Sequence, residues 1–285
     1  MNSLQDILKK SEDFLSKHHA QSPRVEAEWL VAHALDLKRL ELYLQFDRPL
    51  SESELARIRP LIRRRADGEP LQYILGTVPF HDIELAVGPG VLVPRPETEI
   101  LVEQALKLDL KDGEILDLCT GSGAILLALF HQDMLRLSSR QGIGIDLSED
   151  ALHWARKNAD DLQLSERVSF LQGDLFSPVA GKRFALITAN PPYVTDEEYL
   201  QLPHDIRKHE PRLALTSGAD GLDLIRRLVT SLPDFLLPGG WFLMEIGECQ
   251  GAAVKQLLVD QGLEDVAILK DYPGKDRIAK ARLAE

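Results

Sequence analysis

The spacing of hydrophobic and polar residues changes near residue 70 of this chain. Over residues 1–70, apolar side chains recur every three or four positions, which is the period of amphipathic helices. The expected helix starts carry capping or helix-opening residues: Ser3 with Asp6, Ser22 with Pro23, and Ser51 with Glu54. We therefore predict a helical bundle over 1–70, in which Pro60 kinks the third helix or shifts its start.

Beyond residue 70, short apolar runs bounded by turn residues replace the helical period. Residues 68–70 (Gly-Glu-Pro) end the bundle, and residues 71–93 are predicted to form a β-hairpin linker. Residues 94–285 alternate predicted strands with helices, which indicates an α/β domain. The predicted strands are 114–119, 142–145, 168–171, 184–189, 241–246, 265–271 and 276–283, and the predicted helices are 97–106, 124–130 and 250–259.

The tetrad Asn190, Pro191, Pro192, Tyr193 directly follows the predicted strand 184–189, where α/β enzymes build their sites. Its prolines lack N–H donors and stiffen the loop, so the backbone oxygens and the Asn190 carboxamide oxygen can accept hydrogen bonds. Acceptors that grip the N–H bonds of an amide or aromatic NH2 orient its delocalised lone pair toward an electrophilic methyl. Tyr193 would form a flat wall beside that group. The tetrad indicates a methyl-acceptor site, and the alternative is a plain Asn-Pro turn.

A glycine-rich turn lies between the predicted strand 114–119 and helix 124–130. It consists of Thr120, Gly121, Ser122 and Gly123. Glycines let the backbone approach a ligand closely, and the helix start presents unpaired N–H groups. Leu126 stands where a dinucleotide fingerprint would have its third glycine, which disfavours a nicotinamide cofactor.

Acidic residues follow the next two predicted strands. Asp146 ends the first of them, about twenty residues past the glycines, where a carboxylate accepts both hydroxyls of a ribose. Asp174 follows the second, where an acid accepts from an adenine amino group while Leu175 flanks the ring. The two positions imply a cofactor that carries a nucleoside. For each acid alone, the alternative is helix capping or a solvated strand end.

Several motifs together resemble those of the S-adenosylmethionine (SAM)-dependent N5-glutamine methyltransferases that modify peptide-chain release factors. The resemblance covers essentially the whole chain. The motifs are Gly68 to Pro70, Pro94 to Glu99, Asp117 to Gly123, the tetrad at 190–193, Glu210, Pro211, Ala214 and Leu215 before Gly218 and Gly221, and Asp271 to Arg277. With this family in view, we predict a seven-stranded, mostly parallel SAM-dependent methyltransferase (Rossmann-like) domain over 94–285, with helices on both faces, behind a helical substrate-recognition domain.

The resemblance also implies the ligands and the residues that hold them. The cofactor would be S-adenosyl-L-methionine, with S-adenosyl-L-homocysteine as product. Its expected seat comprises Asp117, Cys119, Thr120, Gly121, Ser122, Gly123, Asp146, Asp174, Leu175 and Asn190. The tetrad and Phe80 would hold the glutamine of the Gly-Gly-Gln motif of a release factor. Two residues depart from the family pattern: Cys119 replaces a usual glycine, so the turn must tolerate a side chain, and Leu175 replaces an aromatic of some members, which implies looser adenine contact.

Charge bears on the substrate. Residues 1–80 hold 12 basic and 12 acidic side chains, so the whole net charge of −12 falls on residues 81–285. An acidic catalytic domain repels phosphate, which disfavours transfer to a nucleic-acid amine. Glutamine in a ribosomal protein and a non-catalytic SAM-binding module remain alternatives. The basic run Arg63 to Arg65 is interpreted as a solvated last helical turn in preference to an RNA contact.

The remaining features describe an ordinary soluble protein. Cys119 and Cys249 have no paired spacing, so we expect reduced thiols and no metal site. No apolar run approaches the roughly 20 residues that span a bilayer, and the N-terminus does not resemble a signal peptide. We expect a cytoplasmic monomer with release factors as its partners and no membrane association. Residues 195–217 are long and polar, and form either a mobile lid or an irregular loop.

Overall fold

The computed structural model describes residues 3–18, 20–132 and 140–285. By its internal contacts the chain divides into two compact units. A helical unit comprises Met1–Thr77 together with Pro203–His209, and a catalytic unit comprises Val78–Leu202 and Glu210–Glu285.

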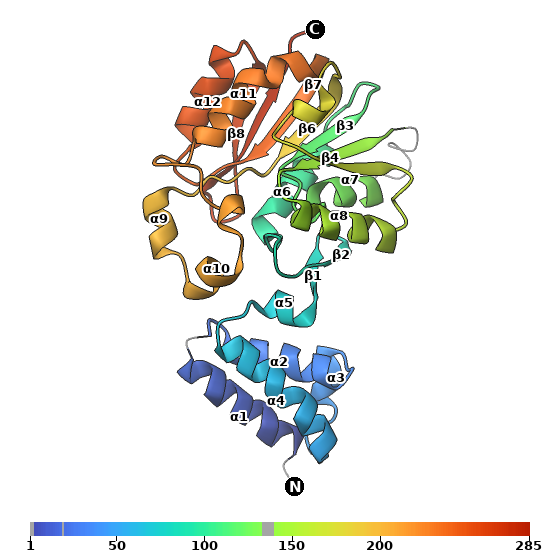
Figure 1. The fold of residues 1–285 in the computed structure, drawn as a ribbon, viewed down its shortest axis with the longest axis vertical. Helices are drawn as coiled ribbons and strands as arrows, with labels where there is room; N and C mark the ends of the chain where they lie inside the picture. The colour runs from blue at the N-terminus through green and yellow to red at the C-terminus, as the bar shows by residue number, and fades with distance from the viewer. Residues whose placement is uncertain (1–2, 19, 133–139) are drawn as a thin grey trace. The chain divides into compact units, whose positions relative to one another are not determined.

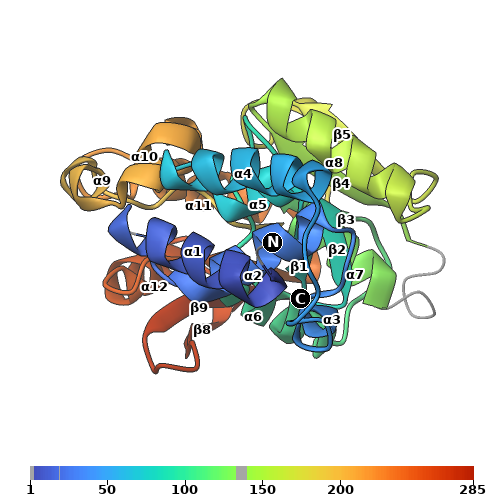
Figure 2. The same ribbon diagram turned by 90° about the horizontal axis from the view of Figure 1, so that it is seen from below.

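The helical unit is a small bundle in which α1, α2 and α4 pack against one another (Figures 1 and 2). Its helices are α1 (Leu4–Lys17), α2 (Pro23–Ala34), α3 (Arg39–Tyr43), α4 (Glu52–Ala66), α5 (Leu71–Leu75) and α10 (His204–His209). The capping boxes predicted at Ser3 and Ser51 are both formed. Pro60 lies inside α4, and the helix still begins at the capped position, so its start is not shifted.

The linker predicted at 71–93 is helical in its first part. Residues Leu71–Leu75 form α5, and only Thr77–Phe80 (β1) and Ile83–Ala86 (β2) form strands. Ile74 is buried in the core of the helical unit, and Gly76 ends the helix at φ +78°, a backbone conformation typical of helix C-termini. The short apolar run was wrongly assigned because helix and strand patterns coincide over five residues.

The basic run at the end of α4 is exposed at Arg63 and Arg64, as predicted, but not at Arg65. Arg65 is 8% exposed and donates hydrogen bonds to Glu26 (2.7 Å), to the backbone oxygen of Glu69 (3.0 Å) and to Asp205 (3.4 Å). Arg64 binds the Glu69 carboxylate at 2.7 Å. Two of the three arginines therefore have structural partners, and the predicted solvated turn is wrong for Arg65.

The catalytic unit is built on a seven-stranded sheet with strand order β5-β4-β3-β6-β7-β9-β8. Its strands are β3 (Ile115–Leu118), β4 (Gly142–Asp146), β5 (Val168–Gln172), β6 (Phe184–Ala189), β7 (Leu236–Glu245), β8 (Glu264–Lys270) and β9 (Asp276–Arg282). The pairs among β3 to β7 are parallel, whereas β9 runs antiparallel to both of its neighbours. The predicted mostly parallel seven-stranded sheet is confirmed.

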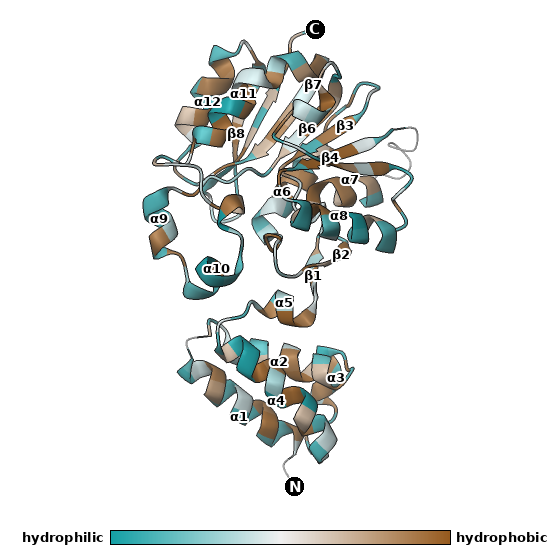
Figure 3. Cartoon of the chain, viewed as in Figure 1, coloured by the Kyte–Doolittle hydropathy of each residue, from teal (hydrophilic) through white to brown (hydrophobic). Residues whose placement is uncertain are grey.

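Helices cover both faces of this sheet. Figure 1 shows α6 (Pro96–Leu106), α7 (Ala124–Gln132) and α8 (Glu149–Asp161) on one face, and α11 (Asp223–Phe235) and α12 (Gly251–Asp260) on the other. The short elements are α9 (Asp196–Gln201), η1 (Ser177–Val179) and η2 (Arg212–Ala214). Every residue of β3 and β6 is buried, as expected for parallel strands covered on both sides, and Figure 3 shows hydrophobic residues along the central strands.

The strand order places a crevice at the middle of the sheet. From β3 the chain proceeds outward to β4 and β5, and then returns to β6 on the other side of β3. Ligands of open α/β sheets bind at such a reversal, beyond the carboxyl ends of the strands.

Candidate active site

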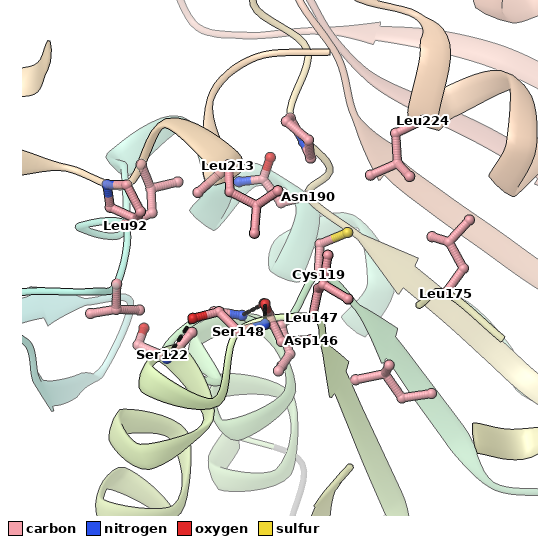
Figure 4. Close-up of a pocket in the computed structure, with 18 of the residues that line it drawn as sticks. Leu92, Cys119, Ser122, Asp146, Leu147, Ser148, Leu175, Asn190, Leu213 and Leu224 are labelled. Atoms are coloured by element: carbon pink, nitrogen blue, oxygen red, sulfur yellow. Dashed lines mark hydrogen bonds between the residues drawn. The ribbon is translucent and has the colours of Figure 1, made fainter. Parts of the chain in front are cut away.

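A cavity of about 390 Å³ lies beyond the carboxyl ends of β3, β4, β5 and β6, within the catalytic unit. Figure 4 shows Asn190 and Leu213 across this cavity from Asp146 and Ser148. The structure brings nine of the predicted site residues to its wall: Cys119, Thr120, Gly121, Ser122, Asp146, Asp174, Leu175, Asn190 and Pro192. Its volume is within the range of small-molecule and cofactor sites.

Asp146 presents a carboxylate to the cavity. One oxygen accepts the backbone N–H of Gly121 and the other that of Ser148, each at 2.9 Å, so each oxygen keeps a lone pair for a ligand. Burial raises the pKa of this carboxyl, and the backbone donors oppose that shift. Two fixed acceptor oxygens in a cavity wall suit a pair of vicinal hydroxyls such as those of a ribose. The site therefore fits a nucleoside-bearing cofactor.

The turn after β3 contains a strained position. Cys119 adopts φ +55°, in the left-handed region that favours glycine, so the turn accommodates this side chain at a cost of about 1–2 kcal/mol. Burial, and then the nearby carboxylates of Asp146, Asp117 and Asp174, raise the pKa of the Cys119 thiol well above its usual range. The thiol is thus held protonated and is a poor nucleophile.

Gly121, also at positive φ, is open to the cavity, because a Cβ there would come within 4 Å only of Val91. Gly123 has a different task. A Cβ on Gly123 would lie 2.9 Å from a methyl of Leu127, so this glycine allows close packing against α7.

Asp117 lies behind the cavity wall. Its buried carboxylate accepts hydrogen bonds from the hydroxyls of Thr120 (2.6 Å) and Thr188 (2.7 Å), which tie the turn to β6. Desolvation raises its pKa to about 7. Asp117 does not line the cavity, contrary to the predicted cofactor contact. Its side chain instead supports the turn, because both of its oxygens accept hydrogen bonds from threonine hydroxyls.

The expected adenine region is apolar with one ion pair. Leu147, Leu175 and Leu224 line it, and Asp174 accepts a hydrogen bond from Arg227 of α11 at 2.7 Å. Arg227 was not expected from the sequence, because it follows Asp174 by 53 residues and has no motif of its own.

The tetrad is tied to two distant residues. The Asn190 amide nitrogen donates to the Thr98 hydroxyl at 3.3 Å, and Thr98 donates to the Glu245 carboxylate at 2.5 Å. The Tyr193 hydroxyl donates to the other oxygen of Glu245 at 3.0 Å. Burial and then the charge of Glu245 raise the pKa of Tyr193. Tyr193 packs against the core between the sheet and α11, and supports the loop from behind.

Neither aromatic residue expected beside the acceptor lines the cavity. Tyr193 is turned toward Glu245, and Phe80 is 1% exposed. In β1 the side chains of Val78 and Phe80 point inward while Pro79 is exposed, so the strand period directs Phe80 into the core. The structure therefore does not support the predicted contact of Phe80 with the substrate.

The segment after the tetrad forms an excursion whose two ends, at Val194 and at 215–217, lie side by side. The backbone of Val194 bonds to Leu215 (2.9 Å) and Ser217 (3.0 Å), which closes the base of the excursion. Arg95 binds both carboxylate oxygens of buried Glu210 at 2.7 Å. The returning chain then contributes Pro211, Leu213, Ala214, Thr216 and Ser217 to the cavity wall. The excursion contains α9, α10 and η2, so it is more regular than expected, and its mobility stays a prediction.

Outside residues 1–2, 19 and 133–139, no group of three His, Cys, Asp or Glu side chains is arranged to hold a metal ion. Over the same part of the chain, no helix has the length and apolar character needed to traverse a bilayer.

Comparison with known proteins identifies the two parts of the chain and their fold. Residues 6–76 match the family model of the PrmC N-terminal domain, and residues 109–244 match that of a methyltransferase domain. The catalytic unit shares the fold of a solved methyltransferase from Pyrococcus furiosus (TM-score 0.51, 17% identity, covering 70% of this chain and 89% of that one). The fold and the cofactor cavity define a SAM-dependent methyltransferase.

Its family follows from nearly full-length relatives. The chain is 39% identical to a release factor glutamine methyltransferase from Geobacter sulfurreducens, covering 99% of this chain and 97% of the relative. It is 43% identical to one from Vibrio cholerae, covering 97% and 95%. The chain belongs to the release factor glutamine methyltransferase family.

Proposed function

We propose that this protein transfers a methyl group from SAM to the side-chain amide nitrogen of the glutamine in the Gly-Gly-Gln motif of peptide-chain release factors. The observation that carries the proposal is the juxtaposition of Asn190 and Asp146 in one cavity, which brings an amide-binding group to the cofactor seat. Family membership over nearly the whole chain supports the choice of substrate.

The protein's own contribution is to bind and orient. When bound, SAM supplies an electrophilic methyl on a sulfonium centre. Asp146 would hold the ribose, and the apolar wall at Leu147 and Leu175 would flank the adenine. The Asn190 side-chain oxygen and the Pro191 carbonyl would accept the two N–H bonds of the glutamine amide. Their grip would aim its lone pair at the methyl carbon, so that the N–C bond forms as the C–S bond breaks and the nitrogen then loses a proton.

Charge distinguishes between the alternative substrates. The acidic residues of 81–285 oppose a nucleic-acid substrate, whereas glutamine of a ribosomal protein would satisfy the same tetrad. A release-factor substrate would place the reaction in the cytoplasm, where translation terminates.

Methyl transfer to purified substrates tests the proposal. The protein is incubated with methyl-labelled SAM and, separately, with release factor, ribosomal proteins and RNA, and mass spectrometry then locates the methyl. We expect label on the release factor, abolished when its Gly-Gly-Gln glutamine is replaced by alanine. Label that persists after this replacement, or that appears only on ribosomal protein or RNA, would refute the assignment.

A further inference from the structure

We propose that Thr98 and Glu245 are positioning residues, which hold the Asn190 carboxamide with its oxygen toward the acceptor and its nitrogen away from it. This inference rests on the proposed function. It concerns two residues that lie 92 positions before and 55 positions after Asn190 and that reach it only through the fold.

The hydrogens available at Thr98 determine the orientation. A hydroxyl has one hydrogen, and that of Thr98 is donated to Glu245 at 2.5 Å. Thr98 therefore offers only lone pairs to Asn190, and only the amide nitrogen of Asn190 can donate to them, as it does at 3.3 Å. If the carboxamide were turned over, its oxygen would face the Thr98 lone pairs and its N–H bonds would face those of the acceptor amide.

Glu245 is the fixed end of this chain of bonds. It lies at the carboxyl end of β7 and is 1% exposed. Its carboxylate accepts hydrogen bonds from the hydroxyls of Thr98 on α6 and Tyr193 after β6. Burial raises the pKa of Glu245, and the nearby charge of Glu97 adds to that shift. The two hydroxyl donors and the positive charge of Arg277 on β9 oppose it. The carboxylate form, with both hydroxyls donating to it, accounts for all three bonds.

One carboxylate thus anchors both ends of the tetrad. Asn190 is held through Thr98, and Tyr193 is held directly. The residues on both sides of the two prolines are therefore fixed by the same buried carboxylate. Such pre-organisation matters for catalysis because the reaction rate depends on how often the acceptor amide points its lone pair at the methyl carbon.

The side-chain amide of Asn190 can be observed directly. The chain contains three asparagines, Asn2, Asn158 and Asn190, so asparagine-selective ¹⁵N labelling gives few side-chain NH2 signals. The Asn190→Asp variant assigns the pair that belongs to Asn190. Spectra of the wild-type protein are then compared with those of Thr98→Val and Thr98→Ser. The control is Thr230→Val, which removes an exposed hydroxyl on α11.

We expect the Asn190 NH2 signals to shift in Thr98→Val and to stay in place in Thr98→Ser and Thr230→Val. With release factor as substrate, kcat of Thr98→Val should fall on the order of tenfold to a hundredfold, with Thr98→Ser restoring most of the loss. Calorimetric affinity for SAM should change by less than about threefold, since Thr98 is assigned no cofactor bond.

The outcomes separate this inference from the proposed function. If no variant or wild-type protein methylates release factor but the Asn190 signals respond as expected, the proposed substrate is wrong and the bond to Thr98 stands. Unchanged signals and unchanged kcat in Thr98→Val would overturn the positioning role. A Thr98→Ser variant as impaired as Thr98→Val would also overturn it, because the hydroxyl would then not be the group that matters.

Discussion

The buried carboxyl of Asp117 makes the stability of the catalytic unit depend on pH in a way that one substitution should remove. Its pKa is raised from 3.8 to about 7 by desolvation. The folded state therefore binds more protons than the unfolded state between these values, and stability falls as pH rises through this interval. In Asp117→Asn, the amide can accept from one threonine hydroxyl and donate to the other, so both bonds found at Thr120 and Thr188 survive without a charge.

The size of the effect follows from the shift. Each pH unit between the two pKa values is worth about 1.4 kcal/mol, so the charge of Asp117 should lower the free energy of unfolding by about 2.5 kcal/mol from pH 5 to pH 8. For a domain of this size, that corresponds to a shift of about 5–10 °C in Tm. We expect the Tm of Asp117→Asn, measured relative to wild type, to rise by this amount over the same interval.

Calorimetric scans of the full-length protein at several pH values measure this difference. Asp234→Asn, at an exposed position of α11, is the matched control and should follow the wild-type curve. Affinity for SAM should be largely kept, because Asp117 does not line the cavity. Parallel Tm curves for wild type and Asp117→Asn would show that the carboxyl titrates normally, and the account of its burial would be wrong.

Three other substitutions test separate parts of the site. Asn190→Ala should lower kcat at least about a hundredfold and keep SAM affinity within about tenfold, and near-normal turnover would contradict the acceptor role. Asp146→Ala should weaken calorimetric SAM binding by about 2–3 kcal/mol through loss of charge-assisted hydrogen bonds, and unchanged affinity would remove it from the ribose site. Gly221→Ala should lower Tm and turnover, since its Cβ would lie 2.1 Å from the Tyr193 carbonyl oxygen at φ +72°. Gly262→Ala, with the same φ and no neighbour within 4 Å, is its control, and equal effects of the two would exclude the steric explanation.

The sequence predicted the features that local chemistry determines. The capping boxes at Ser3 and Ser51 need only residues three positions apart, and β6 is a mainly apolar run that ends at Ala189, directly before Asn190. The glycine turn and Asp146 were located because they directly follow strands. Their meeting in one cavity follows from a parallel sheet, whose carboxyl ends share an edge.

The contacts made across the fold were not predictable in this way. Thr98 belongs to a motif, yet its role depends on Asn190 and Glu245, which no periodicity connects to it. Phe80 was placed beside the substrate by resemblance, whereas the two-residue period of its strand directs it inward. Arg65 was expected in solvent because the charge run was considered without Glu26, its partner on another helix.

Helix α10 limits how the two units can be exchanged between relatives. It is encoded inside the catalytic segment but belongs to the helical unit, where Asp205 meets Arg65 and Lys208 donates to the backbone oxygen of Asp67. A chimera that transplants residues 1–77 alone would separate these partners and leave a foreign α10 beside the new bundle. The helical unit is therefore discontinuous in sequence, and residues 1–77 and 203–209 should be transferred together.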